Sequence, residues 1–206
     1  EVWLCAGQSN MVMPLNGFDY CPISDSNNVI ADAPNHPGIR MVTIKPTVKL
    51  SPQEYAEGSW QQPTTENAPK FSAAAYHYAL TLQRTLQIPI GVITCAWGGS
   101  RVEGWLPKEI LQTYKDEDLT LIGSDKTPVY LQSMLMYNGI LYPCHKYTIK
   151  GFIWYQGESN VRSSRTYAER LATMVKHWRS IWKQGDLPFY YVETVPFACE
   201  YKEDGY

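Results

Sequence analysis

The chain has 206 residues, of which 44% are hydrophobic and 18% are charged, and its formal net charge is −2. So much apolar sequence can bury a large core, which excludes an intrinsically disordered protein. The basic residues form no run that could follow a nucleic acid backbone, and no apolar stretch reaches the roughly 18 residues of a membrane-spanning helix. We therefore expect one globular domain, without a nucleic acid partner and without membrane insertion.

The amino-terminal part of the chain predicts two strands and a helix. Residues 2–6 form a short apolar strand that ends in the turn-forming cluster 7–10. A second strand is expected at residues 39–44, between long irregular segments. Apolar residues then recur at steps of three and four from about residue 72, which predicts an amphipathic helix that Pro89 stops.

The middle of the chain repeats this strand-to-loop pattern. Residues 88–96 are apolar almost without interruption, as in a strand that is covered on both faces, and they lead into the glycine loop 97–100. Short helical pieces are expected near residues 107–114 and 129–141. The sequence therefore places a second polar loop directly after a buried strand.

The carboxyl-terminal part predicts two more strands with a helix between them. The strand at residues 150–155 leads into the polar loop 156–160. A long amphipathic helix follows at 167–182, with Gly185 as its expected stop, and residues 188–195 form a fifth strand. The pattern of strand followed by polar loop thus occurs three times.

Strands that alternate with helices favour right-handed crossovers and a parallel sheet. We therefore predict a doubly wound α/β domain with a mostly parallel, five-stranded sheet. Ligands bind such sheets outside the carboxyl ends of the strands. The fold would gather the three polar loops along that edge, and with them Ser9, Gly98, Gly99 and Gln156.

Ser9 is the candidate nucleophile because it follows a strand end and is flanked by turn-forming residues. The order Gly-Gln-Ser-Asn-Met is not the G-x-S-x-G elbow of the α/β-hydrolases, since Met11 stands where the second glycine should be. The backbone amide of Ser9, a backbone amide of Gly98 or Gly99, and the side-chain amide of Gln156 could form an oxyanion hole. Each signal is weak alone, because serines and glycines are common in ordinary turns.

Other polar and aromatic residues have competing structural interpretations. Trp60 lies in a long polar loop and is the candidate for stacking on a sugar. Glu103 and Glu158 are expected to be structural carboxylates, paired with Arg101 or Arg162, and Glu158 also supports its own loop. Tryptophans at strand positions are expected in the core: Trp3, Trp97 and Trp154.

The cysteines are scattered and include no C-x-x-C pair: Cys5, Cys21, Cys95, Cys144 and Cys199. This arrangement favours buried, free thiols over a disulfide scaffold. No cysteine or histidine pair has the spacing that closes on one metal ion, so no metal site is expected.

The three loops together resemble the sialate O-acetylesterase family of SGNH-like hydrolases, which is related to carbohydrate esterase family 6. The resemblance rests on W-L-C-A-G-Q-S-N-M at 3–11, A-W-G-G-S at 96–100 with Glu103 and Trp105, and W-Y-Q-G-E-S-N at 154–160. It extends from residue 1 to about residue 197. The resemblance implies an SGNH/flavodoxin-like fold and a serine esterase, without metal or organic cofactor, that removes O-acetyl groups from sialic acids.

By the same resemblance, Ser9 matches the nucleophile, and Gly98 or Gly99 and Gln156 match oxyanion-hole positions. Gln8 and Asn10 are expected to support the loop or to contact substrate, like Trp60 and Glu158. An acetylated carbohydrate is the implied partner, and such glycans imply an extracytoplasmic location, whether secreted, periplasmic or lysosomal.

The sequence departs from the family pattern because no aspartate and histidine in a D-x-x-H block follow Tyr155. His36 and His145 precede strands, at the opposite edge of the sheet, and His77 and His177 lie within helices. We therefore expect residues 1–206 to be an incomplete, carboxyl-terminally truncated esterase domain whose catalytic histidine lies downstream.

Two other functions remain open. An acetylxylan esterase shares the Gly-Gln-Ser-Asn and Gln-Gly-Glu loops, and relative rates on acetylated sialic acid and acetylated xylan would separate the two. A non-catalytic sugar-binding module would bind glycan without releasing acetate.

Overall fold

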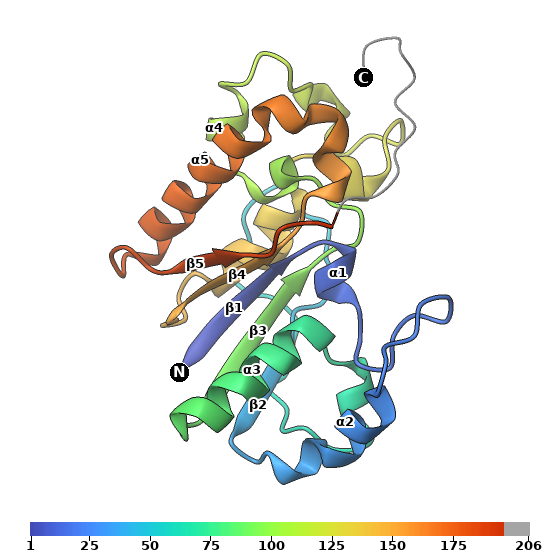
Figure 1. Cartoon of the computed structure of the whole chain (residues 1–206). Helices are drawn as coiled ribbons and strands as arrows, with labels where there is room; N and C mark the ends of the chain where they lie inside the picture. The colour runs from blue at the N-terminus through green and yellow to red at the C-terminus, as the bar shows by residue number, and fades with distance from the viewer. Residues whose placement is uncertain (196–206) are drawn as a thin grey trace.

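A five-stranded parallel sheet runs through the centre of the computed structural model, which describes residues 1–195 (Figure 1). The strand order is β2-β3-β1-β4-β5, and every neighbouring pair is parallel. The predicted doubly wound α/β fold is confirmed. The strands are β1 (Val2–Gly7), β2 (Ile39–Thr43), β3 (Ile90–Ala96), β4 (Gly151–Tyr155) and β5 (Phe189–Tyr191).

The fifth strand is shorter than the sequence predicts. It pairs only with β4, through three register partners, because it lies at the edge of the sheet among the described residues. Beyond the strand, the N–H of Val192 still donates to the carbonyl of Trp154 at 2.9 Å. The apolar pattern over 188–195 therefore extends further than the regular strand.

Helices cover both faces of the sheet, with α2 and α3 on one side and α4 and α5 on the other (Figure 1). In α3, the Ser72 hydroxyl caps the first turn by accepting a hydrogen bond from the Ala75 N–H. The long α5 ends at Trp182, where Lys183 rather than the expected Gly185 takes the left-handed cap position. The helices are α1 (Ser9–Val12), α2 (Ser26–Asp32), α3 (Ala73–Leu86), α4 (Lys108–Leu111) and α5 (Ser164–Trp182).

The core has two layers because successive residues of a strand point to opposite faces. In β1, Leu4 and Ala6 pack toward α5, whereas Trp3 and Cys5 pack toward α3. All seven residues of β3 are buried. This burial on both faces explains the continuous apolar run in that part of the sequence.

The order of the strands brings the three polar loops together. From β1 the chain passes to β2 and β3 on one side, and from β3 it crosses over to β4 and β5 on the other. The carboxyl ends of β3, β1 and β4 are therefore direct neighbours at the point where the connections change direction. That switch point is where open α/β sheets bind their ligands.

Three further sequence expectations concern cysteines, metals and membranes. Cys5, Cys95 and Cys144 are buried free thiols, but Cys21 is exposed, and Cys199 lies outside the described residues. Within residues 1–195 there is no group of three or more potential metal-ligating side chains. No helix in this part of the chain combines the length and the apolar character that crossing a bilayer requires.

Candidate active site

Ser9 is the first residue of α1, directly after β1, and it is partly exposed. Its Oγ forms no hydrogen bond with any of residues 1–195. Its backbone N–H, at the first position of a helix, also lacks an acceptor in this part of the chain. A hydroxyl and an N–H group are thus both available at the carboxyl edge of the sheet.

The glycine loop after β3 borders Ser9. The N–H of Trp97 donates to the carbonyl of Gly7 at 3.0 Å, which holds the start of this loop against β1. A Cβ built on Gly98 would lie 4.0 Å from the Cβ of Ser9 and would meet nothing closer. The backbone N–H of Gly98 has no acceptor among the described residues. Gly98 therefore lies beside the nucleophile candidate with its amide free.

Gly99 lies against an aromatic ring. It has a φ of +75°, and a Cβ built on it would lie 2.7 Å from the ring of Tyr130. Tyr130 is itself exposed. Tyr130 lies in a short helical turn, Val129–Leu131, that carries no sequence motif from which its position could be predicted.

Gln8 is buried and joins the loop after β1 to the loop after β4. Its backbone N–H donates to the Tyr155 carbonyl at 3.0 Å. Its side-chain Oε1 accepts hydrogen bonds from the N–H groups of Gly157, at 3.2 Å, and Ser159, at 3.3 Å. Of the two roles expected for Gln8, these contacts match support of the loop rather than substrate contact.

Asn10 and Glu158 also join these two loops. The Nδ2 of Asn10 donates to the Oε1 of Glu158 at 2.6 Å. The other carboxylate oxygen of Glu158 is buried and has no partner among the described residues. Glu158 therefore pairs with Asn10, and not with the arginines that the sequence suggested.

The side chain of Gln156 does not have the arrangement expected of an oxyanion donor. It is only 2% exposed, and its Nε2 donates to the Ser100 carbonyl at 3.0 Å and to the Asn160 Oδ1 at 2.8 Å. Its Oε1 accepts from the Tyr167 hydroxyl at 2.9 Å. A side-chain amide has two donor hydrogens, so both are committed. In this structure the Gln156 side chain joins the loop after β4 to Ser100 and Asn160, and its role as an oxyanion donor stays a prediction.

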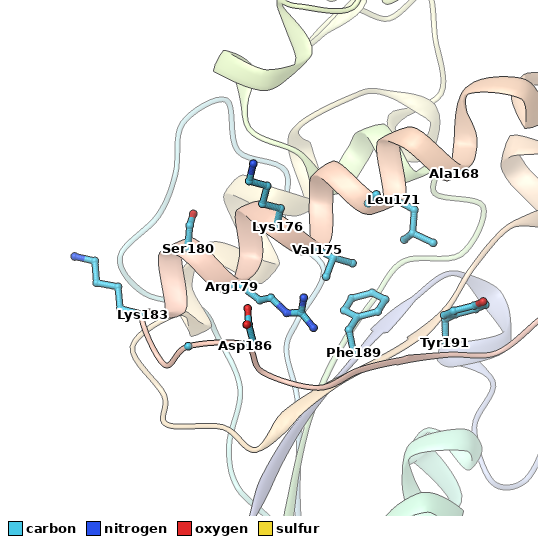
Figure 2. A pocket seen from close by; sticks show the side chains of 12 residues that line it. Ala168, Leu171, Val175, Lys176, Arg179, Ser180, Lys183, Asp186, Phe189 and Tyr191 are labelled. Atoms are coloured by element: carbon cyan, nitrogen blue, oxygen red, sulfur yellow. The ribbon is translucent and has the colours of Figure 1, made fainter.

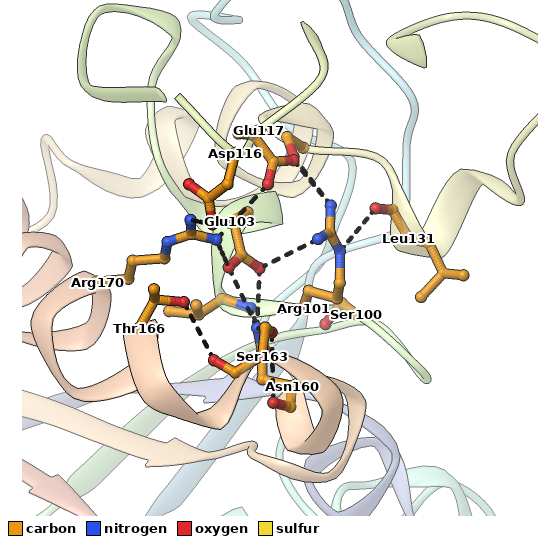
Figure 3. Close-up of polar contacts among 12 residues, drawn as sticks. Ser100, Arg101, Glu103, Asp116, Glu117, Leu131, Asn160, Ser163, Thr166 and Arg170 are labelled. Atoms are coloured by element: carbon orange, nitrogen blue, oxygen red, sulfur yellow. Dashed lines mark hydrogen bonds and ion pairs between the residues drawn. The ribbon is translucent and has the colours of Figure 1, made fainter. Parts of the chain in front are cut away.

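A buried polar cluster lies between these loops and α5 (Figure 3). Its centre is Glu103, which is 0% exposed and forms an ion pair with Arg170. The Nδ2 of Asn160 donates to both Glu103 oxygens, at 3.2 and 3.0 Å. Arg101, the partner that the sequence suggested, is more distant, at 3.9 Å. Arg170 was missed because it lies 67 residues away, within a helix with no motif.

The charge of Arg170 is stabilised by the carboxylates around it. Burial works against the charged form, but hydrogen bonding to Glu103 and the charges of Glu103 and Asp116 outweigh burial and raise the pKa of the guanidinium. A second buried carboxylate, Glu117, pairs with Arg101 at 2.8 Å and lies 3.6 Å from Arg170. The Arg170 guanidinium thus lies among three carboxylates, those of Glu103, Asp116 and Glu117.

Trp60 lies at the wrong edge of the sheet for the role that the sequence suggested. Its ring would be 3.4 Å from a Cβ on Gly91, and Gly91 pairs with Val2 at the amino ends of β3 and β1. A strand rises about 3.3 Å per residue, so the five steps from Gly91 to Ala96 separate Trp60 from the carboxyl edge by roughly 16 Å. Trp60 is therefore not beside Ser9.

None of the four histidines has a hydrogen bond to Ser9. His36 pairs with Asp32 at 2.8 Å, just before β2, and the Nδ1 of His145 donates to the Tyr142 carbonyl at 2.6 Å, before β4. His77 is exposed on α3, and His177 contacts the Tyr137 hydroxyl near the end of α5. The expected catalytic base is thus absent from the residues that the structure describes.

A separate groove of about 750 Å³ lies between α5 and β5 (Figure 2). Leu171, Val175 and Phe189 form its apolar part, and Lys176, Arg179 and Lys183 come from the same helix end. It contains none of the predicted site residues.

Comparisons with known proteins identify a family and a fold for this chain. The sequence profile of the family described as "Carbohydrate esterase, sialic acid-specific acetylesterase" matches residues 1–204. The sialate O-acetylesterases of Homo sapiens and Pongo abelii are each 27% identical over 194 residues, which cover 90% of this chain and 36% of the relative. The chain therefore spans little more than a third of the length of these relatives.

Among solved structures, the carbohydrate acetylesterase XAC1771 from Xanthomonas citri superposes with a TM-score of 0.80 and 31% identity, over 93% of this chain and 40% of that one. An Arabidopsis thaliana protein, AT4G34215, shares the fold with a TM-score of 0.57 at 17% identity, over 92% of this chain and 72% of that one.

Proposed function

Because the chain belongs to the sialic acid-specific acetylesterase family of carbohydrate esterases, we propose that it is the nucleophile-bearing part of a serine esterase that removes O-acetyl groups from a carbohydrate. Sialic acid is the proposed sugar, following the names of the curated relatives. The observation that carries the proposal is the placement of Ser9 beside Gly98, with the Ser9 hydroxyl and both backbone N–H groups unpaired among residues 1–195.

In the proposed reaction, the Ser9 Oγ attacks the acetyl carbonyl carbon and its proton passes to a base. The negative charge that develops on the carbonyl oxygen is stabilised by the N–H groups of Ser9 and of Gly98, with Gly99 as the alternative donor. The sugar oxygen leaves as it takes the proton, and water then releases acetate from the serine. This scheme needs no metal or organic cofactor.

The base is the part of the scheme that residues 1–195 do not supply. We propose that a histidine, with an aspartate two or three residues before it, enters the site from outside the described residues, so that residues 1–206 make up part of the catalytic domain. An extracytoplasmic location remains a prediction from the proposed substrate.

Acetate release by the full-length protein tests the proposal. Ser9→Ala should reduce acetate release from O-acetylated sialic acid by several orders of magnitude, because a nucleophile is lost, and should leave the fold intact. Ser26→Ala is a matched control, since Ser26 is also the partly exposed first residue of a short helix. Activity above a few per cent in Ser9→Ala would reject the assignment.

The identity of the sugar is tested by comparing two substrates, because the Xanthomonas citri neighbour is described only as a carbohydrate acetylesterase. A higher kcat/KM on acetylated sialic acid than on acetylated xylan would support the proposed specificity, and the reverse order would identify an acetylxylan esterase. Glycan binding with no acetate release at high protein concentration would indicate a non-catalytic module.

A further inference from the structure

The buried carboxylate of Glu103 requires an explanation beyond stability. Burying a charge costs several kcal/mol of desolvation, and buried ion pairs can often be replaced by apolar residues without loss of stability. Glu103 is 0% exposed, and Arg170 and Asn160 both donate to it. A charge at such a position is better explained by what it orients than by what it stabilises.

Glu103 fixes the orientation of the Asn160 side chain (Figure 3). An ionised carboxylate only accepts hydrogen bonds, so Asn160 must turn its Nδ2 toward Glu103 and its Oδ1 away. The Oδ1 then accepts from the Val102 N–H at 2.9 Å and from the Gln156 Nε2 at 2.8 Å. One amide oxygen thus joins the segment after β3 to the loop after β4.

Gln156 carries this connection to the glycine loop. The same Nε2 donates its second hydrogen to the Ser100 carbonyl at 3.0 Å. The N–H of Ser100 donates to the Trp97 carbonyl at 3.2 Å, which closes the turn that contains Gly98 and Gly99. The glycine turn is therefore held from its carboxyl-terminal side, at Ser100 and at Val102.

We propose that Glu103 is a positioning residue for the esterase reaction: through Asn160 and Gln156 it holds the Gly98–Gly99 turn where its N–H groups meet the developing oxyanion. This inference rests on the proposed function. Donors that are fixed in advance lower the barrier because no reorganisation is needed during the reaction. Arg170 and Arg101 offset the charge of Glu103, so the carboxylate orients the loop without repelling the oxyanion.

Glu103→Gln tests the proposal in the full-length protein with p-nitrophenyl acetate as the probe. The amide keeps the size of the side chain but must direct its NH₂ group at a donor, either Arg170 or Asn160. We expect kcat to fall by about 10- to 100-fold, as for a small misplacement of a catalytic group, with KM changed by less than about threefold. Glu109→Gln, on the exposed face of α4, is the control and should keep the wild-type kcat.

Amide hydrogen exchange gives a readout that does not depend on activity. Glu103→Gln should accelerate amide exchange in residues 97–102 and 156–160 and leave exchange in α3 unchanged, because the hydrogen bonds that depend on Glu103 join only these two loops. A purely structural role would raise exchange in α3 as well. If Glu103→Gln does not fold, Glu103→Asp keeps the charge with a shorter reach and should show both effects in weaker form.

Wild-type kcat and wild-type exchange in residues 97–102 of a folded Glu103 variant would overturn the proposal, and so would equal loss of protection throughout the protein. Failure of the proposed function is distinguishable, because it would appear as acetate release by Ser9→Ala whatever residue stands at position 103.

Discussion

A Cβ on Gly7 would lie 2.1 Å from the carbonyl oxygen of Tyr155. These two residues are register partners at the carboxyl ends of β1 and β4. The same carbonyl accepts the N–H of Gln8 at 3.0 Å, so the chain bends toward Tyr155 immediately before Ser9. Gly7 has a φ of +149°, a conformation that residues with side chains rarely adopt. The nucleophile candidate thus depends on a close approach that glycine alone permits.

Gly7→Ala should destabilise the protein strongly, because it introduces both a backbone clash and an unfavourable φ. We expect a loss of more than about 2 kcal/mol in the free energy of unfolding, measured by urea denaturation. Gly185→Ala is the matched control: its φ is +77°, but its Cβ would meet nothing within 4 Å, so it bears only the conformational cost of about 1 kcal/mol. Equal losses for the two variants would contradict the steric argument.

Gln156→Ala should lower the stability of the protein as well as kcat. The change leaves the buried Ser100 carbonyl without a donor, and it removes one of the two hydrogen bonds that the Asn160 Oδ1 accepts. The Tyr167 hydroxyl loses its bond to the Gln156 side chain but still reaches the backbone carbonyl of residue 156. Each buried polar group that loses its partner costs about 1–3 kcal/mol. A direct oxyanion donor would behave differently, with kcat reduced by about 10²–10³ and the unfolding free energy unchanged. Measuring both quantities on one variant therefore decides which role Gln156 has.

Arg170→Met should cost about 3–5 kcal/mol, because it leaves the Glu103 carboxylate buried without its main counter-charge. The side chain of Arg170 is 3% exposed. The double variant Glu103→Gln/Arg170→Met should be more stable than Arg170→Met alone, since the unpaired charge is gone. For comparison, Arg84→Met removes a solvent-exposed ion pair with Asp32 and should cost no more than about 1 kcal/mol. A double variant less stable than Arg170→Met would contradict this account.

His177 should make stability depend on pH. Burial lowers the pKa of His177 below its usual value of 6.5, and the charge of Glu109 opposes this only partly. The unfolded chain therefore binds the proton more readily than the folded protein does. The contribution of neutral His177 to the free energy of unfolding is complete above about pH 6.5, and it is lost as the pH falls through the lower pKa of the folded state. His177→Phe should remove this part of the slope between pH 7 and pH 5, and an identical slope in the two proteins would exclude His177 as its source.

Trp60→Ala should leave KM for acetylated sugars unchanged, because Trp60 packs near Gly91 at the amino edge of the sheet. Tyr130→Ala offers the matched aromatic truncation. Since the ring of Tyr130 lies against Gly99 and is exposed, we expect that variant to raise KM. Steady-state kinetics on both variants would show whether the sugar binds at the carboxyl edge of the sheet. A raised KM in Trp60→Ala alone would contradict binding at that edge.

The sequence by itself determined the sheet and the set of loops at its edge. Continuous apolar runs such as residues 90–96 have to be covered on both faces, and strands that alternate with helices have to run parallel. In a parallel sheet, loops that follow strands share one edge whatever their detailed conformation. The placement of Ser9 and Gly98 at the same edge follows from these rules, whereas the direct pairing of β1 with β3 comes from the structure.

Only the tertiary structure decided what the individual side chains do there. A glutamine such as Gln156 can donate to substrate or to protein, and the choice depends on acceptors that Ser100 and Asn160 bring from other loops. Glu103 forms its ion pair with Arg170, and no local sequence pattern predicts a pairing between residues so far apart in the chain. The irregular segment around Trp60 has no periodicity that would indicate the edge of the sheet to which it returns. Hydrogen-bond partners, loop paths and the order of the strands are set by long-range packing, whereas the strands themselves and the shared edge of their loops follow from the local hydrophobic pattern and the alternation of strands and helices.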